Sequence, residues 1–338
     1  MLTFVLYECI ITITNNNQQN EPTKQNLSYK GGINYLIELI ELNKVYKMDN
    51  LELLNQLPNN YIDLIYSDIL FNTGKKFKDY NDNLGTPQQA IEWYRPRIEE
   101  MYRVLKDTGS IYLHMDYRLV HYIKVLMDEI FGFDNFRNEI YWRKRNGNLK
   151  APSNKLNIFT DNILHYTKSN KYTYNIQYKS YPNEYLKRFK YDDNDGNGKY
   201  RWSPLACYSD EKIKELESQN RLRRGKNAKQ PEFKYYLKDL KGIPLDNIWD
   251  DINMINAQSN ERINYDTQKP KELIHRIINI SSNKDDIVLD LFCGSGTSMV
   301  VAKELGRKYI GCDISERAIE ISEKRLNEVD GNGKLDVS

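Results

Sequence analysis

The sequence predicts an α/β fold built on a doubly wound, mostly parallel β-sheet. Two observations predict it. Short apolar runs typical of buried strands alternate with amphipathic stretches of helical period, and a glycine-containing turn joins one of these strands directly to a helix. A chain of 338 residues with 40% apolar content is also large enough to bury the core of such a sheet. Helices are therefore expected on both faces of the sheet.

The elements expected in the first half follow this alternation. Thr86 and Pro87 are typical of an N-cap and a first helical turn, which predicts a helix running to about Lys106. A second helix is expected over 117–130, before Gly132. The expected strands are 44–48, 61–67, 110–115 and 138–143.

The second half repeats the alternation after Thr267. The expected helices cover 270–281, 297–305 and the stretch from Ser315 onwards, and the expected strands are 286–291 and 307–312. Ligands of open α/β sheets bind at the carboxyl ends of the strands. The residues that follow each strand are therefore the first candidates for a functional site.

Charge is segregated along the chain, although its net value is only +2. Residues 141–241 contain 23 Lys and Arg against 11 Asp and Glu, a net charge of +12, so the remainder carries −10. The same segment is rich in Tyr and Trp, whose rings can stack on bases. This combination favours nucleic-acid binding over an ordinary solvated surface.

Neither the N-terminus nor the cysteines indicate a secreted or metal-binding protein. Residues 1–14 are apolar but lack the basic start and cleavage site of a signal peptide, so we interpret them as an extra strand or a dispensable leader, followed by a flexible polar linker. No apolar run reaches the roughly 18 residues of a membrane span, which predicts a soluble cytoplasmic protein. Four cysteines without CxxC spacing predict a reduced chain without a metal site: Cys9, Cys207, Cys293 and Cys312.

The stretch DLIYSDILFNTG, residues 63–74, places an acid and an aromatic ring at the end of an expected strand. Asp68 and Phe71 stand in the polar turn that follows the apolar run. Taken singly, such an acid can be a turn or helix-capping residue, and such a ring can belong to the core. Together at the carboxyl end of a strand, they are candidate site residues.

A second candidate site follows the strand 286–291. Gly294 and Gly296 allow a tight turn and close approach of a ligand to the backbone, and Asp313, about 20 residues downstream, can accept hydrogen bonds from ribose hydroxyls. This predicts a nucleoside cofactor. A dinucleotide fingerprint would require glycine at position 299, which is Met299, so a nicotinamide-dependent oxidoreductase is the less favoured alternative.

These motifs together resemble those of a known enzyme family. LDLFCGSGT followed by GCD is similar to the first two motifs of S-adenosylmethionine-dependent methyltransferases. TQKP, residues 267–270, and the acid-plus-aromatic strand tip resemble the beta class of DNA amino-methyltransferases, in which the catalytic half precedes the cofactor half. The resemblance covers about residues 40–330 and implies a circularly permuted, Rossmann-like methyltransferase sheet with an inserted basic target-recognition region.

The resemblance divides the chain into five parts: an N-terminal extension and linker (1–40), a catalytic half (41–144), a target-recognition region (145–245), a cofactor-binding half (246–330) and a tail (331–338). Six basic residues in and beside the basic segment are expected to face DNA phosphates. They are Arg143, Lys144, Arg145, Arg221, Arg223 and Arg224.

The same resemblance implies which residues hold S-adenosylmethionine. The cofactor turn would comprise Asp290, Phe292, Gly294, Ser295, Gly296 and Thr297, with Asp313 on the ribose. The methionine end would lie near Thr267, Gln268 and Lys269, bordered by Asp68. Asp49 stands where the family often has an acid near the adenine, although the glycine that precedes it there is Met48 here.

The catalytic motif implied by the resemblance is an acid, two prolines and an aromatic residue, which here reads Asp68-Ile69-Leu70-Phe71. A base must leave the duplex stack before its amino group can be methylated. Phe71 would stack on the flipped base, while Asp68 and the Ile69 carbonyl would accept hydrogen bonds from the amino group. No metal or covalent intermediate is required. The missing prolines leave open how the tip keeps its geometry.

The expected activity is site-specific methylation of adenine N6 in double-stranded DNA, within or derived from a restriction–modification system. An acid at Asp68, where serine is the other option, resembles the adenine-specific members. The family implies a cognate restriction endonuclease and a homodimer as further partners. Four alternatives stay open: a cytosine-N4 DNA methyltransferase, a catalytically weakened DNA-binding relative, an RNA or protein methyltransferase, and the oxidoreductase.

Overall fold

The computed structural model describes residues 40–144, 156–206, 208–224, 230–256, 258–263, 265 and 267–331. The predicted N-terminal extension up to residue 39, Arg145, Cys207 and the tail from residue 332 lie outside the described residues. The chain divides into two units, Met1–Glu41 and Leu42–Ser338, and every described helix and strand belongs to the second. Within the described ranges, no helix is long and apolar enough to cross a membrane.

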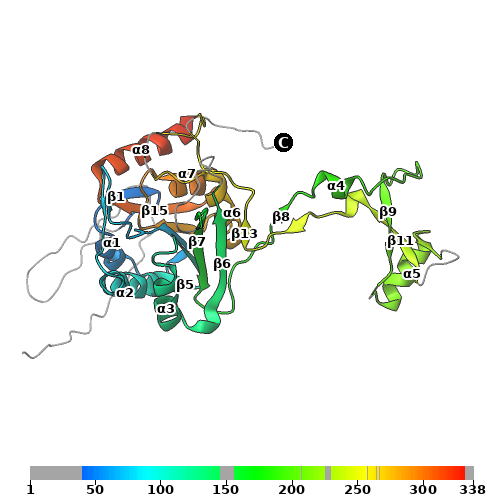
Figure 1. The fold of residues 1–338 in the computed structure, drawn as a ribbon, viewed down its shortest axis with the longest axis horizontal. Coiled ribbons are helices and arrows are strands. Elements are labelled where there is room, and N and C mark those ends of the chain that lie inside the picture. The colour runs from blue at the N-terminus through cyan, green and yellow to red at the C-terminus, as the bar shows by residue number, and fades with distance from the viewer. Residues whose placement is uncertain are drawn as a thin grey trace, which may run out of the picture. The chain divides into compact units, whose positions relative to one another are not determined.

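An eight-stranded sheet forms the centre of the second unit (Figure 1). Its order is β1-β15-β14-β2-β5-β7-β6-β13, and all neighbours pair in parallel except β7, which is antiparallel to β5 and β6. The predicted α/β fold with a mostly parallel sheet is confirmed. The strands are β1 (Lys44–Lys47), β2 (Ile62–Asp68), β5 (Leu105–Met115), β6 (Phe136–Arg143), β7 (Thr160–Thr167), β13 (Ile248–Trp249), β14 (Ile287–Asp290) and β15 (Lys308–Asp313).

Two groups of helices pack beside this sheet (Figure 1). In the first group α1 (Asn50–Gln56) contacts α2 (Pro87–Val104), which contacts α3 (Val120–Phe131). In the second, α7 (Thr297–Glu304) lies between α6 (Lys271–Ser281) and α8 (Glu316–Gly331). The expected start of α2 is confirmed: the helix begins at Pro87 with Thr86 as its N-cap, and Thr86 and Gln89 form a reciprocal capping box.

Two core elements do not follow from the sequence pattern. Helix α1 is only seven residues long and is capped by Asp49, whose side chain accepts from the Leu51 N–H at 2.8 Å. Strand β7, with the sequence TDNILHYT, lies inside the predicted target-recognition region 145–245 but pairs with both β5 and β6. Its Ile163 and Leu164 are fully buried. The sequence of β7 shows neither the polar–apolar alternation of a half-exposed strand nor a long apolar run. Pairing with β5 and β6 therefore decides its conformation.

Between β7 and β13 the chain forms small antiparallel sheets and short helices. Many of the aromatic rings in this segment pack within it: Phe189, Tyr200, Phe233 and Tyr236 are buried. The composition of the segment alone suggests that its rings stack on bases. These four rings are buried and are therefore not free to do so. The elements are β8 (Tyr178–Lys179) paired with β12 (Ile243–Pro244), the sheet β10-β11-β9 (Leu222–Arg223, Glu232–Tyr236, Tyr200–Pro204), α4 (Asn183–Leu186) and α5 (Asp210–Ser218).

Candidate active site

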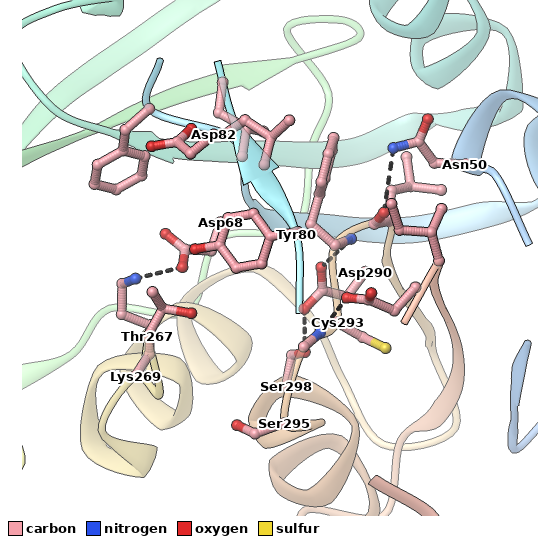
Figure 2. A pocket seen from close by; sticks show the side chains of 18 of the residues that line it. Asn50, Asp68, Tyr80, Asp82, Thr267, Lys269, Asp290, Cys293, Ser295 and Ser298 are labelled. Carbon is pink, nitrogen blue, oxygen red and sulfur yellow. Dashed lines mark hydrogen bonds and ion pairs between the residues drawn. The ribbon is translucent and has the colours of Figure 1, made fainter. Parts of the chain in front are cut away.

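The carboxyl ends of four neighbouring parallel strands bring acidic residues to one edge of the sheet. In the order β1, β15, β14, β2, the strands end at or just before Asp49, Asp313, Asp290 and Asp68. All four residues line one pocket, part of which is shown in Figure 2. The parallel register places them together although they are up to 264 positions apart in the chain.

The turn after β14 is tied to the end of β15 through Asp313. The Gly294 N–H donates to Asp313 Oδ2 at 3.0 Å, and the Ser315 N–H donates to Asp313 Oδ1 at 2.9 Å. Burial raises the pKa of the Asp313 carboxyl. The predicted cofactor turn and the predicted ribose acid are thus joined directly, and both line the pocket.

Neighbouring protein atoms lie close to both glycines of this turn. Gly296 has φ +73°, and a Cβ there would lie 2.6 Å from Ser322 Oγ on α8. At Gly294, with φ +48°, a Cβ would lie 3.2 Å from the Tyr265 ring. Helix α8 therefore approaches the backbone closely at Gly296, and the left-handed backbone adds a second reason for glycine. The close approach of a ligand to this turn stays a prediction.

Asp290 is buried at the end of β14, in the centre of Figure 2. Its Oδ1 accepts from the Phe292 N–H at 3.1 Å, and its Oδ2 accepts from the Ser298 hydroxyl. Burial outweighs these bonds and, with the negative charges of Asp68 and Asp313, raises the pKa of Asp290 to about 7. Its protonation state therefore changes near neutral pH.

The remaining residues of the turn support it from two sides. The Phe292 ring lies 6.3 Å from that of Trp93, centroid to centroid. Arg325, on α8, donates to the Ser295 carbonyl at 2.6 Å and to Thr297 Oγ1 at 3.0 Å. Phe292, Ser295 and Thr297 all line the pocket.

Asp49 has an evident structural partner. Arg97 on α2 donates to Asp49 Oδ2 at 3.0 Å and to Asn50 Oδ1 at 2.7 Å, and its guanidinium lies 3.5 Å from the centroid of the Trp93 ring. Asn50 in turn donates to the Leu291 carbonyl at 3.4 Å. Asp49 lines the pocket, and this cluster connects α1 to the turn after β14.

The strand tip carries the other half of the pocket. Asp68 Oδ2 forms an ion pair with Lys269, visible in Figure 2 with Thr267 beside it. The Lys269 ammonium also lies 5.4 Å from the centroid of the Phe71 ring. Asp68 Oδ1 is buried without a hydrogen-bond partner. An ionised carboxylate oxygen in this condition is a strong acceptor for an incoming donor.

The proline-free tip is held by hydrogen bonds. The Ile69 N–H donates to the His114 carbonyl at 3.1 Å, a bond that proline could not make. The Tyr94 hydroxyl donates to the Leu70 carbonyl at 2.9 Å. Beyond the tip, the buried Asp82 accepts from the backbone N–H groups of residues 72 and 73 at 2.9 and 3.0 Å. These contacts fix the backbone between β2 and α2.

Behind Asp68 lies a buried polar chain that sequence reasoning missed. His114 Nε2 is 3.3 Å from Asp161 Oδ2, and Nδ1 is 3.0 Å from the Tyr66 hydroxyl. Burial opposes ionisation of Asp161, but its interactions with His114 and the charge of Lys144 lower its pKa to about 2. The register pairs Asp68 on β2 with His114 on β5. The position of His114 near the end of an expected strand, directly after SIYL, is the sequence signal that could have placed it in the site.

This chain reaches the buried oxygen of Asp68. The ionised Asp161 only accepts, so His114 Nε2 carries a proton toward it. His114 Nδ1 lies 3.0 Å from the Tyr66 hydroxyl, whose pKa is raised by burial. The same nitrogen is 3.6 Å from Asp68 Oδ1, which is beyond hydrogen-bond distance.

The TQKP segment divides between the pocket and the loop ahead of it. Thr267 and Lys269 line the pocket. Gln268 instead holds the preceding loop, because its side chain accepts from the Ile263 N–H at 3.0 Å and donates to the Glu261 carbonyl at 2.7 Å. The structure therefore gives Gln268 a supporting position.

The residues expected to face DNA differ in what they contact. Arg143 at the end of β6 and Arg224 after β10 are exposed. Lys144 is turned toward Asp161, with which it forms an ion pair.

Arg221 and Arg223 are both paired within the inserted segment. Arg221 contacts Asp239 at 2.7 Å. Arg223 contacts Glu232 at 2.7 Å, and its guanidinium lies 4.0 Å from the centroid of the Trp202 ring. Their charge is thus partly offset locally.

Comparisons with known proteins agree with this geometry. Residues 62–324 match the DNA methylase family. The type II methyltransferase M.EcaI of Enterobacter cloacae is 31% identical, over 85% of this chain and 70% of its own. The DNA adenine methyltransferase YhdJ of Escherichia coli strain K12 is 27% identical, over 82% and 81%. The solved PvuII DNA methyltransferase (cytosine-N4-specific) shares the fold, with a TM-score of 0.53 at 17% identity over 85% and 89%.

Proposed function

The chain belongs to the DNA methylase family and uses S-adenosylmethionine, and we propose that it methylates N6 of a flipped-out adenine at a specific site in duplex DNA. The observation that carries this proposal is the Asp68 carboxylate. One of its oxygens is buried without a hydrogen-bond partner, and Asp68 lines the pocket that also contains Phe71 and the turn at Gly294. The pocket therefore offers an acceptor where an amino group would be held.

The chemistry follows from positioning. S-adenosylmethionine supplies a methyl group bound to a positively charged sulfur. Asp68 Oδ1 and the Ile69 carbonyl would accept the two amino hydrogens, which directs the nitrogen lone pair toward the methyl group. Phe71 would stack on the base. The new N–C bond would form as the bond from sulfur to the methyl group breaks, with S-adenosylhomocysteine as the leaving group. The nitrogen would then keep both hydrogens and carry the positive charge, which Asp68 is placed to stabilise until one proton passes to water.

Other residues of the pocket are proposed to bind the cofactor. Asp313 would accept hydrogen bonds from the ribose hydroxyls, because its carboxylate is fixed by the turn and lines the pocket. Asp290 would face the positively charged methionine end. Phe292 and Asp49 would border the adenine. Each of these roles extends the family resemblance to a residue that the structure brings into the pocket.

The strand tip without prolines is proposed to be a working variant. Prolines would restrict the backbone at positions 69 and 70. Here the Ile69 N–H bond to His114 and the Tyr94 bond to the Leu70 carbonyl supply an equivalent restraint. A catalytically weakened relative is the competing proposal, and the absence of both prolines is the observation that favours it.

The choice of adenine rests on Asp68 and on the relative YhdJ, an adenine methyltransferase. Cytosine N4 is the second candidate, because the PvuII enzyme with the same fold is cytosine-specific. The basic segment with Arg143 and Arg224 exposed is proposed to bind the phosphates around the target. We also propose that the protein acts together with a cognate restriction endonuclease and that it forms a homodimer.

The experiment is methylation-sensitive sequencing of DNA from cells that express the protein. We expect N6-methyladenine at one short sequence motif. A methyl group found at cytosine N4 would show that the target base is cytosine and not adenine. A folded protein that binds S-adenosylmethionine but transfers no labelled methyl group to mixed DNA sequences would favour the weakened relative.

A further inference from the structure

The contact between Lys269 and Asp68 places a donor and an acceptor side by side in the pocket. Asp68 Oδ1 is an unpaired acceptor, and Asp68 Oδ2 holds the Lys269 ammonium. An ammonium has three N–H groups, so those not directed at Asp68 remain to be shared with other acceptors. The pair thus presents an acceptor and a charged donor on neighbouring atoms, as Figure 2 shows.

Base edges differ in the order of these groups. Adenine has an amino donor next to the acceptor N1, and cytosine has an amino donor next to the acceptor N3. Guanine and thymine show the reverse order, a carbonyl acceptor next to a ring N–H donor. A flipped base is read by hydrogen bonds to this edge. The Asp68–Lys269 pair therefore matches adenine and cytosine and opposes guanine and thymine.

The position of Phe71 fits the same arrangement. The Lys269 ammonium is 5.4 Å from the centre of the Phe71 ring, and Phe71 lies three residues after Asp68 in the same tip. A base stacked on this ring would have its edge near both members of the pair. Lys269 is also only 14% exposed at its side chain, so a bond that it makes is sheltered from water.

We propose that Lys269 reads the ring nitrogen beside the target amino group, N1 if the target is adenine, while Asp68 holds the amino group itself. This inference rests on the proposed function for the identity of the base. The motif alone assigns Lys269 to the methionine end of the cofactor, whereas this inference assigns it to the base. Lys269 is then a specificity-determining residue.

The test combines an altered base with an altered protein. Duplexes carrying the motif found by sequencing are made with adenine or with 1-deazaadenine, which lacks N1, at the target. We expect wild-type protein to lose about 10- to 100-fold in kcat/KM on 1-deazaadenine, the effect of removing one hydrogen bond to a charged donor. The analogue 7-deazaadenine, which keeps N1, serves as the control and should react within about threefold of adenine.

The variant Lys269→Met keeps a side chain of similar reach without the donor. It should be slower on adenine and should lose the preference over 1-deazaadenine, whereas Lys269→Arg should keep part of that preference. If Lys269→Met is too slow to assay, affinities of wild type and variant for the two duplexes in the presence of S-adenosylhomocysteine give the same comparison. Equal rates or affinities of wild type on both bases, or an undiminished preference in Lys269→Met, would overturn the inference.

The inference and the proposed function fail separately. If sequencing shows a cytosine target, adenine is excluded, and the same comparison is made with cytosine and 3-deazacytosine, which lacks N3. Loss of preference in Lys269→Met would then still support Lys269 as the reader of the ring nitrogen. Retained preference would reject it for either base.

Discussion

His114 Nε2 lies 3.3 Å from Asp161 Oδ2, and both side chains are buried in the sheet behind the strand tip at Asp68. The bond joins two adjacent antiparallel strands, β5 and β7, and fixes the orientation of the His114 ring. The ring in turn lies 5.9 Å from that of Phe71, centroid to centroid. The position of Phe71 therefore depends on a strand that the sequence pattern conceals.

Replacing His114 by phenylalanine is expected to lower the free energy of unfolding by about 2 to 3 kcal/mol, because Asp161 and the Tyr66 hydroxyl each lose a buried partner. Urea unfolding measures this change. His165→Phe is the matched control, since His165 is also buried but its Nε2 has no partner. A similar loss in both variants would show that the ring volume matters and the bond to Asp161 does not.

Asp161 also predicts how stability depends on acid. Its pKa in the folded chain is about 2, below the value of 3.8 expected without the fold, so the folded state binds fewer protons in this range. Its contribution, about 2 kcal/mol, is complete above pH 4 and is lost as the pH falls from about 4 to 2. In His114→Phe this part of the acid-unfolding curve should shrink. An unchanged curve would remove His114 as a stabiliser of the Asp161 charge.

Asp290 predicts a pH dependence of cofactor binding. Its pKa of about 7 means that it is largely neutral at pH 6 and ionised at pH 8. Because S-adenosylmethionine carries positive charge at its methionine end, its affinity should rise about tenfold over this interval. Calorimetric titration of wild type and Asp290→Asn measures this. The variant should bind more weakly at pH 8 and show little change with pH, and a wild-type affinity that is flat with pH would contradict the assignment.

Gly296→Ala is expected to destabilise the fold by about 3 kcal/mol, from the left-handed backbone and the overlap with Ser322 together. Gly74→Ala is the control, because Gly74 has the same φ of +73° with no atom within 4 Å of a new Cβ, so only the backbone cost of about 1 to 2 kcal/mol should appear. Thermal unfolding compares the two. Equal losses would show that packing against α8 contributes nothing.

Asp68→Ala should keep its affinity for S-adenosylmethionine and for DNA but lose at least about a hundredfold in kcat, since Asp68 is proposed to act on the reacting nitrogen. Single-turnover transfer of a labelled methyl group measures the rate, and calorimetry checks cofactor binding. A variant that retains more than about a tenth of the rate would exclude Asp68 as the acceptor of the amino hydrogen.

The double variant Arg223→Gln, Arg224→Gln should reduce the salt dependence of DNA binding by about 0.9 in log–log slope for each phosphate that the protein no longer neutralises. The control is Arg95→Gln, because Arg95 is likewise paired with a carboxylate, Glu129 at 2.7 Å, but stands on α2 outside the basic segment. Fluorescence anisotropy at several salt concentrations gives the slopes. A slope that changes equally in both would place Arg223 and Arg224 away from the DNA.

The sequence by itself determined the alternation of strands and helices, the start of α2 at Thr86, and the turn at Gly294. These features depend on neighbours close in the chain: an apolar run, a cap, a glycine in a tight turn. The acid and the ring at the tip were equally visible, because Asp68 ends an apolar strand and Phe71 follows three residues later.

Only the tertiary structure decided what those residues contact. Lys269 meets Asp68 across 201 positions, and Asp161 meets His114 through β7, whose mixed polar sequence gives no periodic signal. Gly296 is fixed by Ser322 on α8. Strand order and helix packing set these interactions. They arise from the folding free energy of the whole chain, so no local pattern specifies that Asp68 is held at one oxygen by Lys269 and left open at the other.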